Sequence, residues 1–475
     1  MLQHRRTFII VLVALSLVYV YQLCSTSRNH ESPPWVRQGR DMPNSTLSFE
    51  KIFVINLPSR RDRRDAMVIA GAVSNFNFTF LEGLTGDRVS SAPKGADQDR
   101  VGIKPSHSAS AGARGSWGSH VSALRTIVDH GLGSALVLED DVDWDARLKT
   151  QMETFAMASR MWLGVQQQQQ QKREEIARLR NLKTTKPPRG GSRGLLSRVL
   201  SIFSGNREQE LEADSGAPGG RARKEEFDRD TIPLPPNSSP SSHRGHKARI
   251  ESPYGDGWDV LWLGHCGAEL PTARRESPSS AGDPFSPSSS SSSSSSLKIS
   301  IPGDMTVPAP KHLQPHPFAL RDALADAYPA HTRVVHATCG NVCSLAYAVS
   351  QGGARKLLRQ VKQEGFVSQW DLMLRDYCIG GGYEDGGGRG GEDGGDGSGL
   401  VCLTVQPPLI SHRYAGEAGG ASVSDIRGQG GGLARGKKGT PYVRLSVQEN
   451  LDRLVAGFPV DWLVDQLPDE GGTLW

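Results

Sequence analysis

The stretch Ala135-Leu136-Val137-Leu138-Glu139-Asp140-Asp141-Val142-Asp143 decides the predicted fold. Its four leading apolar residues predict a buried strand, and the carboxylates that follow would lie at the edge of a sheet. Carboxylates packed together without a counter-charge are destabilising, so the cluster indicates a divalent cation. Oxygen ligands suit Mg²⁺, Mn²⁺ or Ca²⁺ better than Zn²⁺. The alternative is a solvated acidic turn at the start of the next helix.

Strands and helices alternate on both sides of this stretch. Upstream, residues 51–57 and 77–84 predict strands, and residues 115–130 predict a helix. Downstream, the predicted strands span 258–266, 333–337, 343–349 and 400–410, and the predicted helices span 146–163, 353–361 and 370–378. This order favours an α/β domain with a mostly parallel sheet and helices on its faces.

The composition indicates that much of the chain is not packed. Of 475 residues only 37% are hydrophobic, and 54 Gly and 29 Pro concentrate in a few segments that bury too little apolar surface to fold. We predict a domain over 49–426, interrupted by disordered insertions at 166–253, 269–300 and 380–399, and a C-terminal extension over 427–475. The net charge of +4 gives no reason to expect a nucleic-acid partner.

The N-terminus predicts a membrane anchor. His4-Arg5-Arg6 precedes an apolar run over residues 8–21, so residues 1–24 read as a cytoplasmic tip and a transmembrane signal anchor, with a stem over 25–48. A cleaved signal peptide is the alternative. The basic flank predicts a single-pass type II protein of the Golgi or endoplasmic reticulum membrane with its domain in the lumen. Glycosylation triplets at Asn44, Asn77 and Asn237 fit that location.

Two further motifs suggest an anion site. Arg60, Arg63 and Arg64 share one face at a helix start, where guanidinium groups suit a diphosphate, although a solvated face paired with Asp62 and Asp65 is the alternative. Ser116 or Ser119 is the predicted N-cap of the next helix, and His120 lies in its first turn. His120 either contacts substrate or is a structural hydrogen-bonding residue.

Five cysteines lie beyond Cys24, so at least one thiol stays unpaired if the others form disulfides. Cys339 and Cys343 have the spacing of metal ligands, but no second pair at zinc spacing accompanies them, and we interpret them as structural. Cys378 and Cys402 flank the third insertion, where a disulfide would close its base.

The ordered set Val54-Ile55-Asn56-Leu57, Arg60 with Arg63, Gly118-Ser119-His120 and Leu138-Glu139-Asp140-Asp141-Val142 resembles glycosyltransferase family 25, the lipopolysaccharide and procollagen galactosyltransferase group. Later blocks, including 258–267, 343–349 and 424–426, look like its fungal membrane-anchored branch. The resemblance implies a single GT-A-like catalytic domain that uses a nucleotide-diphosphate sugar, with UDP-galactose favoured, together with Mn²⁺ or Mg²⁺.

The resemblance also implies roles for individual residues. Asp141 and Asp143 are the preferred metal ligands, with Asp140 and Glu139 in reserve. The residues expected on the donor side are Asn56, Arg60, Arg63, Arg64, Ser119 and His120. Asp371 is the expected base that deprotonates a hydroxyl of a glycan or glycoprotein acceptor, with His412 and Asp425 as alternatives. The competing functions are a metal-dependent nucleotide-sugar or phosphodiester hydrolase and a catalytically silent luminal binding module.

Overall fold

A computed structural model describes residues 44–89, 110–184, 230–235, 252–272, 296–379, 399–415 and 438–475. The predicted anchor, most of the stem, Asp425 and much of the three predicted insertions lie outside these ranges. No helix within the ranges is long and apolar enough to cross a membrane.

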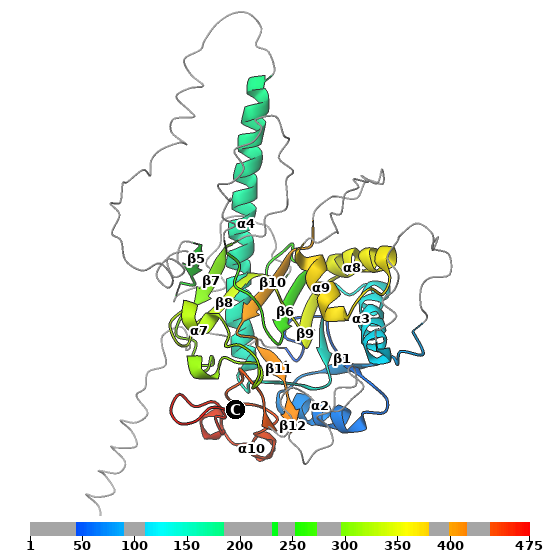
Figure 1. Ribbon diagram of the computed structural model, residues 1–475, viewed down its shortest axis with the longest axis vertical. Coiled ribbons are helices and arrows are strands. Elements are labelled where there is room, and N and C mark those ends of the chain that lie inside the picture. Colours follow the sequence, from blue (N-terminus) through cyan, green and yellow to red (C-terminus); the bar gives the residue numbers. More distant parts are fainter. Residues whose placement is uncertain are drawn as a thin grey trace, which may run out of the picture.

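A large sheet runs through the described part of the chain in the order β2-β1-β3-β9-β6-β10-β8-β7-β5 (Figure 1). Its strands are β1 (Lys51–Asn56), β2 (Phe78–Glu82), β3 (Ser134–Glu139), β5 (Thr231–Pro233), β6 (Val260–Gly264), β7 (Lys298–Ile301), β8 (Arg333–Ala337), β9 (Ala346–Ser350) and β10 (Cys402–Gln406), joined off this path by β4 (Val142–Trp144) and β11 (Ile410–His412). Along the described path, β8 and β9 run against the direction that the other strands share. The sheet is therefore mostly parallel, as predicted, and the mixed α/β architecture is compatible with a GT-A-like fold.

Helices cover both faces of the sheet. One face packs against α2 (Arg61–Val73) and α4 (Leu148–Thr184), and the other against α3 (Ala111–Asp129), α8 (Gln351–Glu364) and α9 (Trp370–Ile379). Side chains of β3 alternate between the two layers, because Leu136 and Leu138 belong to the first core and Ala135 and Val137 to the second. This alternation decides which face each carboxylate after β3 will reach.

The helix α3 begins earlier than predicted. Its N-cap is Ser110, whose Oγ accepts a hydrogen bond from the backbone N–H of Ala113 at 3.1 Å. Ser119 is therefore a mid-helix residue. The lack of a side chain at Gly115 lets the helix pack closely, since a Cβ there would lie 2.4 Å from the carbonyl oxygen of Leu84.

Two predicted insertions begin or end at the wrong place. The helix α4 continues to Thr184, past the predicted boundary at 166, because Gln, Lys, Glu and Arg all favour helix (Figure 1). Residues 231–233 and 298–300, both predicted to be disordered, form paired strands of the sheet. The side chain of Lys298 is buried and donates to the carbonyl oxygens of Pro271 and Ser296 at 3.0 and 2.8 Å. Strands of three and four residues next to low-complexity sequence are too short for a periodicity to reveal.

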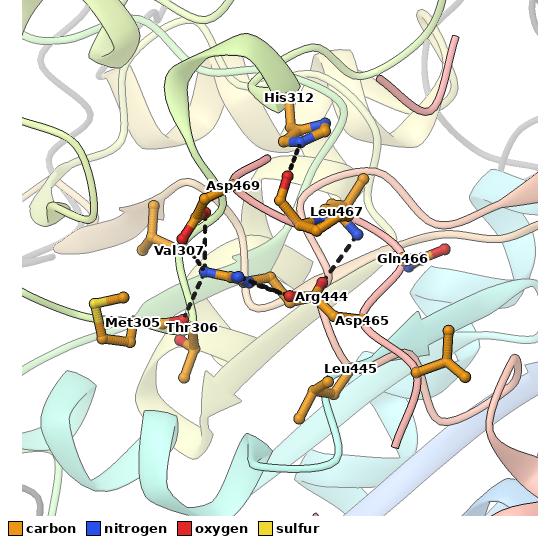
Figure 2. Close-up of polar contacts among 12 residues, drawn as sticks. Met305, Thr306, Val307, His312, Arg444, Leu445, Asp465, Gln466, Leu467 and Asp469 are labelled. Atoms are coloured by element: carbon orange, nitrogen blue, oxygen red, sulfur yellow. Dashed lines mark hydrogen bonds and ion pairs between the residues drawn. The ribbon is translucent and has the colours of Figure 1, made fainter. Parts of the chain in front are cut away.

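Residues 438–475 of the predicted C-terminal extension, here called the C-terminal strap, pack on the sheet domain. The remaining short elements are η1 (Pro310–His312), α7 (Leu324–Ala327), β12 (Tyr414–Ala415), β13 (Lys438–Gly439), α10 (Leu451–Val455) and η3 (Val460–Trp462). Figure 2 shows Arg444 of the strap between Asp465 and Asp469, with ion pairs of 2.6 and 3.2 Å. The same guanidinium donates to the carbonyl oxygen of Met305 at 3.3 Å, which ties the strap to the domain.

The other end of the domain and its disulfides complete the frame. Leu47, assigned to the stem by prediction, is only 1% exposed and belongs to the first core. A disulfide joins Cys378 to Cys402, as predicted, and another joins Cys266 to Cys343. Cys339 is a free thiol. The second disulfide fixes the loop before β9 to the end of β6.

Candidate active site

Strand alternation divides the acidic run between two faces of the sheet. The side chain of Glu139 lies on the α3 side, where Ser344 Oγ donates to Glu139 Oε1 at 2.9 Å. The side chain of Asp140 lies on the α2 side, where Asn56 Nδ2 donates to Asp140 Oδ2 at 2.7 Å. The run predicted as one metal site is therefore two sites around one strand end.

Arg63 links two adjacent carboxylates on the α2 side. Its Nη1 lies 2.8 Å from Asp140 Oδ1 and 2.9 Å from Asp141 Oδ2. The side chains of Arg63, Asp140 and Asp141 are 10%, 10% and 17% exposed, so the three charges are largely removed from water. Asn56 also donates to the carbonyl oxygen of Arg60 at 3.0 Å, which fixes the start of α2 against the end of β1.

The pKa values of the two carboxylates are shifted in opposite directions. Burial, followed by the charge of Asp141, raises the pKa of Asp140 to about 6, against the effect of Arg63 and Asn56. Burial alone would also raise the pKa of Asp141, but Arg63 and His412 outweigh it and hold that pKa well below its usual range. The pair therefore carries a crowded negative charge that a single guanidinium does not fully balance.

The strand β11 brings His412 to the same pair. It runs antiparallel to β4, which places His412 opposite Val142 and puts His412 Nε2 3.5 Å from Asp141 Oδ2. The next residue, Arg413, donates its backbone N–H to the carbonyl oxygen of Asp141 at 2.9 Å. The guanidinium of Arg413 is half-buried and forms no ion pair with a residue that the structure describes. The sequence prediction missed Arg413, although its place beside His412 was a usable signal.

Asp143 has a structural environment. It is fully buried, and its carboxylate accepts hydrogen bonds from Thr440 Oγ1 at 2.8 Å, from Ser446 Oγ and from the backbone N–H groups of Trp144 and Gln448. Burial raises its pKa, and these donors oppose the rise. Each oxygen of Asp143 accepts two of these hydrogen bonds, from the C-terminal strap and β4, whereas each oxygen of Asp140 accepts one. This placement argues against the predicted role of Asp143 as a preferred metal ligand.

Asp140 and Asp141 are suited to bind a divalent cation whose remaining ligands come from the substrate. Asp141 Oδ1 is buried and has no hydrogen-bond partner among the described residues, which is a costly state for a carboxylate oxygen. In the described ranges, no three His, Cys, Asp or Glu side chains are arranged to hold a metal ion by themselves. Mg²⁺ and similar ions are usually held by one or two carboxylates plus substrate phosphates, so this pair is a sufficient protein contribution.

Several predicted site residues lie in other environments. Arg60 pairs with Asp62 at 2.9 Å, and the guanidinium of Arg64 lies over the ring of Phe80 at 4.1 Å. Ser119 Oγ donates to the carbonyl oxygen of Gly115 and accepts from the backbone N–H of Leu84, so it holds a loop to α3. These contacts give all three residues structural partners, and for Arg60 the partner is Asp62, as in the alternative stated for the arginine face.

The α3 side of the strand end gathers a second polar cluster. His120 Nε2 lies 3.5 Å from Glu139 Oε1, and its Nδ1 is 2.9 Å from the hydroxyl of Tyr347. Asp371, the expected base, accepts the backbone N–H of Cys343 at 2.9 Å, next to Ser344 in the chain. Ser344 was not predicted, and no sequence signal connects it to Glu139, which is 205 residues away.

Comparison with known proteins supports the resemblance read from the motifs. Residues 49–189 match the model of glycosyltransferase family 25 (LPS biosynthesis protein). Procollagen galactosyltransferase 2 of Mus musculus and that of Homo sapiens are each 29% identical to the chain over 111 residues. That alignment covers 22% of this chain and 18% of each relative, so the chain spans under a fifth of the length of these curated relatives. The segment that matches the family model, residues 49–189, contains Asn56, Arg63 and the acidic run, whereas Ser344 and His412 lie outside it.

Proposed function

We propose that this chain, whose residues 49–189 match glycosyltransferase family 25, moves a hexose from a nucleotide-diphosphate sugar to a hydroxyl of a glycan or glycoprotein. Galactose is the favoured hexose and UDP the favoured carrier. The observation that carries the proposal is the pair Asp140 and Asp141 at the carboxyl end of β3, with one buried oxygen unpartnered. Ligands of open α/β sheets bind at the carboxyl ends of the strands, which is where this pair lies.

The α2 side of the strand end is the proposed donor site. Asp140 and Asp141 would hold Mn²⁺ or Mg²⁺, which when bound supplies Lewis-acid stabilisation of the leaving diphosphate. Asn56 fixes one oxygen of Asp140, and Arg63 fixes one oxygen of each carboxylate, so both side chains are held in place before substrate arrives. Arg413 adds a guanidinium that is not engaged by described side chains and suits a phosphate oxygen.

A secretory-pathway location is part of the proposal. It is motivated by the apolar run over residues 8–21 and by two disulfides, which persist in oxidising compartments. Asn77, the acceptor of one glycosylation triplet, is exposed and directly precedes β2. Enzymatic removal of N-glycans is expected to increase the electrophoretic mobility of the full chain, with a smaller increase for Asn77→Gln. No change in mobility for the wild-type chain would contradict this location.

The function is tested by incubating the purified full chain with Mn²⁺ and a panel of nucleotide-diphosphate sugars, with and without glycan and glycoprotein acceptors. Release of the nucleoside diphosphate and labelling of the acceptor are followed in parallel. Transfer that requires both donor and acceptor is the expected result. Asp141→Asn is expected to abolish it, whereas Asp62→Asn, at an exposed aspartate that pairs with Arg60, is the matched control and is expected to keep it.

Two other outcomes identify the competing functions. Donor turnover that acceptors neither accelerate nor redirect would indicate a metal-dependent hydrolase. A catalytically silent binding module would be indicated by two results together. The purified, folded chain would neither hydrolyse nor transfer any donor, and cells that carry the double variant Asp140→Asn and Asp141→Asn would keep the wild-type phenotype.

A further inference from the structure

One segment of the C-terminal strap exposes apolar side chains that the core does not use. Residues 455–464, here called the apolar loop, run from the end of α10 through η3. The exposed apolar side chains of this loop are Val455 (68%), Phe458 (40%), Val460 (41%), Trp462 (63%) and Val464 (46%). Large exposed apolar patches mark sites that bind a protein or a membrane, so the apolar loop is a candidate docking surface.

Polar contacts hold the apolar loop in a defined conformation. The backbone N–H of Val464 donates to Asn450 Oδ1 at 2.7 Å, and Asn450 Nδ2 donates to the carbonyl oxygen of Val464 at 3.0 Å. Arg453 Nη1 donates to the carbonyl oxygen of Trp462 at 2.7 Å. The rings of Phe458 and Trp462 lie with their centroids 5.8 Å apart. The apolar side chains therefore form a fixed surface.

The charge and the composition of this surface indicate what it binds. From residue 451 to residue 464 the charged side chains are Asp452, Arg453 and Asp461, two acids against one base, and lysine is absent. Binding would therefore rest on apolar contact with little help from anionic lipids. Tryptophan is enriched where headgroups meet hydrocarbon, and the anionic lipids of a cell membrane face the cytoplasm. A zwitterionic luminal lipid surface fits these features.

The predicted anchor would keep the domain close to such a surface. The apolar run ends at residue 21, and the described residues begin at Asn44. At about 3.4 Å per residue, residues 22–43 could span at most about 75 Å. If residues 8–21 cross a bilayer as predicted, a second contact with that bilayer is intramolecular, so a small apolar surface is enough to maintain it.

The chain enters the domain on the side of the strap. The backbone N–H of Asn77 donates to the carbonyl oxygen of Ser45 at 2.8 Å, and the ring of Phe76 lies 5.7 Å from that of Trp144. The carbonyl oxygen of Trp144 accepts the backbone N–H of Val447 in the strap at 3.0 Å. Trp144 thus lies between the entry of the chain and the strap, and a bilayer that holds the anchor is within reach of the apolar loop.

We propose that the apolar loop docks on the zwitterionic lipid surface of the membrane that holds the predicted anchor. This inference goes beyond the proposed transfer and rests on the proposed location. Trp462 and Phe458 lie at the interface between headgroups and hydrocarbon. The bilayer then holds the domain at two points, the anchor and the strap, which fixes the orientation of the domain relative to the membrane. A second copy of the chain is the competing occupant.

The test measures contact between Trp462 and lipid in the full chain. The chain is reconstituted at one copy per disc in phosphatidylcholine nanodiscs whose acyl chains are either normal or brominated, because bromine quenches only tryptophans that lie against it. Trp462→Phe is expected to reduce the quenched emission by the share of one tryptophan among nine. Val455→Ser with Val460→Ser, which keeps Trp462, is expected to reduce it similarly. Thermal melting followed by circular dichroism checks that the variants fold.

The matched control removes exposed apolar side chains far from the strap. Ile176 and Leu179 are 49% and 37% exposed, and Figure 1 shows the distal end of α4 at the opposite end of the described molecule from α10. Ile176→Ser with Leu179→Ser is expected to keep the wild-type quenching. High salt is also expected to leave the quenching unchanged, since the contact is apolar.

Four results would overturn the proposal. The first is equal quenching in wild type and Trp462→Phe, and the second is equal loss of quenching in the α4 control. The third is a chain that is dimeric in detergent and becomes monomeric with Trp462→Ser, which would assign the apolar loop to a second copy. The fourth is cleavage of residues 1–24, which would remove the tether. An anchored wild-type chain without quenching at Trp462 refutes the docking alone, whereas a chain without N-glycans refutes the proposed location.

Discussion

Two arginines in this molecule each hold a pair of aspartates, with different results. Arg63 bridges Asp140 and Asp141 at the strand end, and Arg444 bridges Asp465 and Asp469 in the C-terminal strap (Figure 2). The strap carboxylates are 26% and 40% exposed, whereas those at the strand end are 10% and 17% exposed. The same ionic motif therefore occurs once in a partly hydrated setting and once in a dry one.

The two clusters also differ in how completely their oxygens are occupied. Asp465 Oδ1 accepts the backbone N–H of Leu467 at 2.9 Å, and Asp469 Oδ2 lies 3.6 Å from His331 Nε2, so the strap pair has a partner at every oxygen. At the strand end, Asp141 Oδ1 has none among the described residues. A completed set of partners marks a structural cluster, and an incomplete buried set marks a candidate binding site.

The largest expected effect comes from exchanging Asp for Asn in each cluster. Asp140→Asn removes one of two crowded charges and can keep the Asn56 or the Arg63 contact but not both, because an amide has a single accepting oxygen. Transfer is therefore expected to fall by about 10²-fold or more while the melting temperature changes little. Asp465→Asn is expected to do the reverse, with a lower melting temperature and transfer kept within about threefold. Initial rates and calorimetric melting measure both. If Asp140→Asn melts lower and transfers normally, the contrast between the clusters is wrong.

Removal of Arg444 from the C-terminal strap is expected to lower stability and to leave transfer unchanged. Arg444→Met removes the cation that Asp465 and Asp469 share and frees the carbonyl of Met305. Because both carboxylates are partly hydrated, we expect a loss of about 1–2 kcal/mol in the free energy of unfolding. Urea unfolding of the full chain measures it, with Arg453→Met of the same strap as the control. Unfolding free energies that agree within about 0.5 kcal/mol would show that the strap does not depend on this cluster.

Asp322 sharpens the comparison because it is a buried carboxylate without an arginine. Burial raises its pKa to about 6, against about 3.9 in an unfolded chain. Between these values the folded state keeps a proton that the unfolded chain has lost, so the contribution of Asp322 to stability falls as pH rises from about 4 to about 6. Asp322→Asn removes this loss and can still accept the Leu324 N–H and Gln406 Nε2–H bonds. We expect the variant to match wild type near pH 4 and to exceed it by about 1–2 kcal/mol at pH 7. A difference that does not change with pH would contradict the raised pKa.

The smallest effect on transfer and stability is expected from substitution of Arg64, which is next to Arg63 in the chain. Arg64 is exposed and lies over Phe80, so Arg64→Met is expected to change transfer by less than about threefold and stability by less than about 1 kcal/mol. Arg63→Met, measured beside it, should abolish most transfer. Equal losses of transfer in the two variants would support the prediction that Arg60, Arg63 and Arg64 form a single donor site.

The sequence predicts the positions of the strands better than the contacts between side chains at the site. Apolar runs predict the strands around Val54, Leu138 and Trp262. The alternation of side chains from Leu136 to Asp140 also implies that Glu139 and Asp140 face opposite layers. Ser344 could not be predicted, and His412 was predicted as an alternative base but not as a neighbour of Asp141, because both reach the acidic run only through tertiary structure across the long insertions. Ser119 and Arg64 have residue types that suit an anion, and only their neighbours reveal structural roles.

The burial of Asp143 beneath Thr440 and Ser446 has a consequence for synthesis. A domain emerges from the ribosome N-terminal end first, so the strand end and its acids are made long before the strap that covers Asp143. Until residues 440–448 have left the ribosome exit tunnel, this carboxylate lacks its strap donors, and the carbonyl of Trp144 in β4 lacks the backbone N–H of Val447. The chain should therefore complete the packing around Asp143 only late in translation.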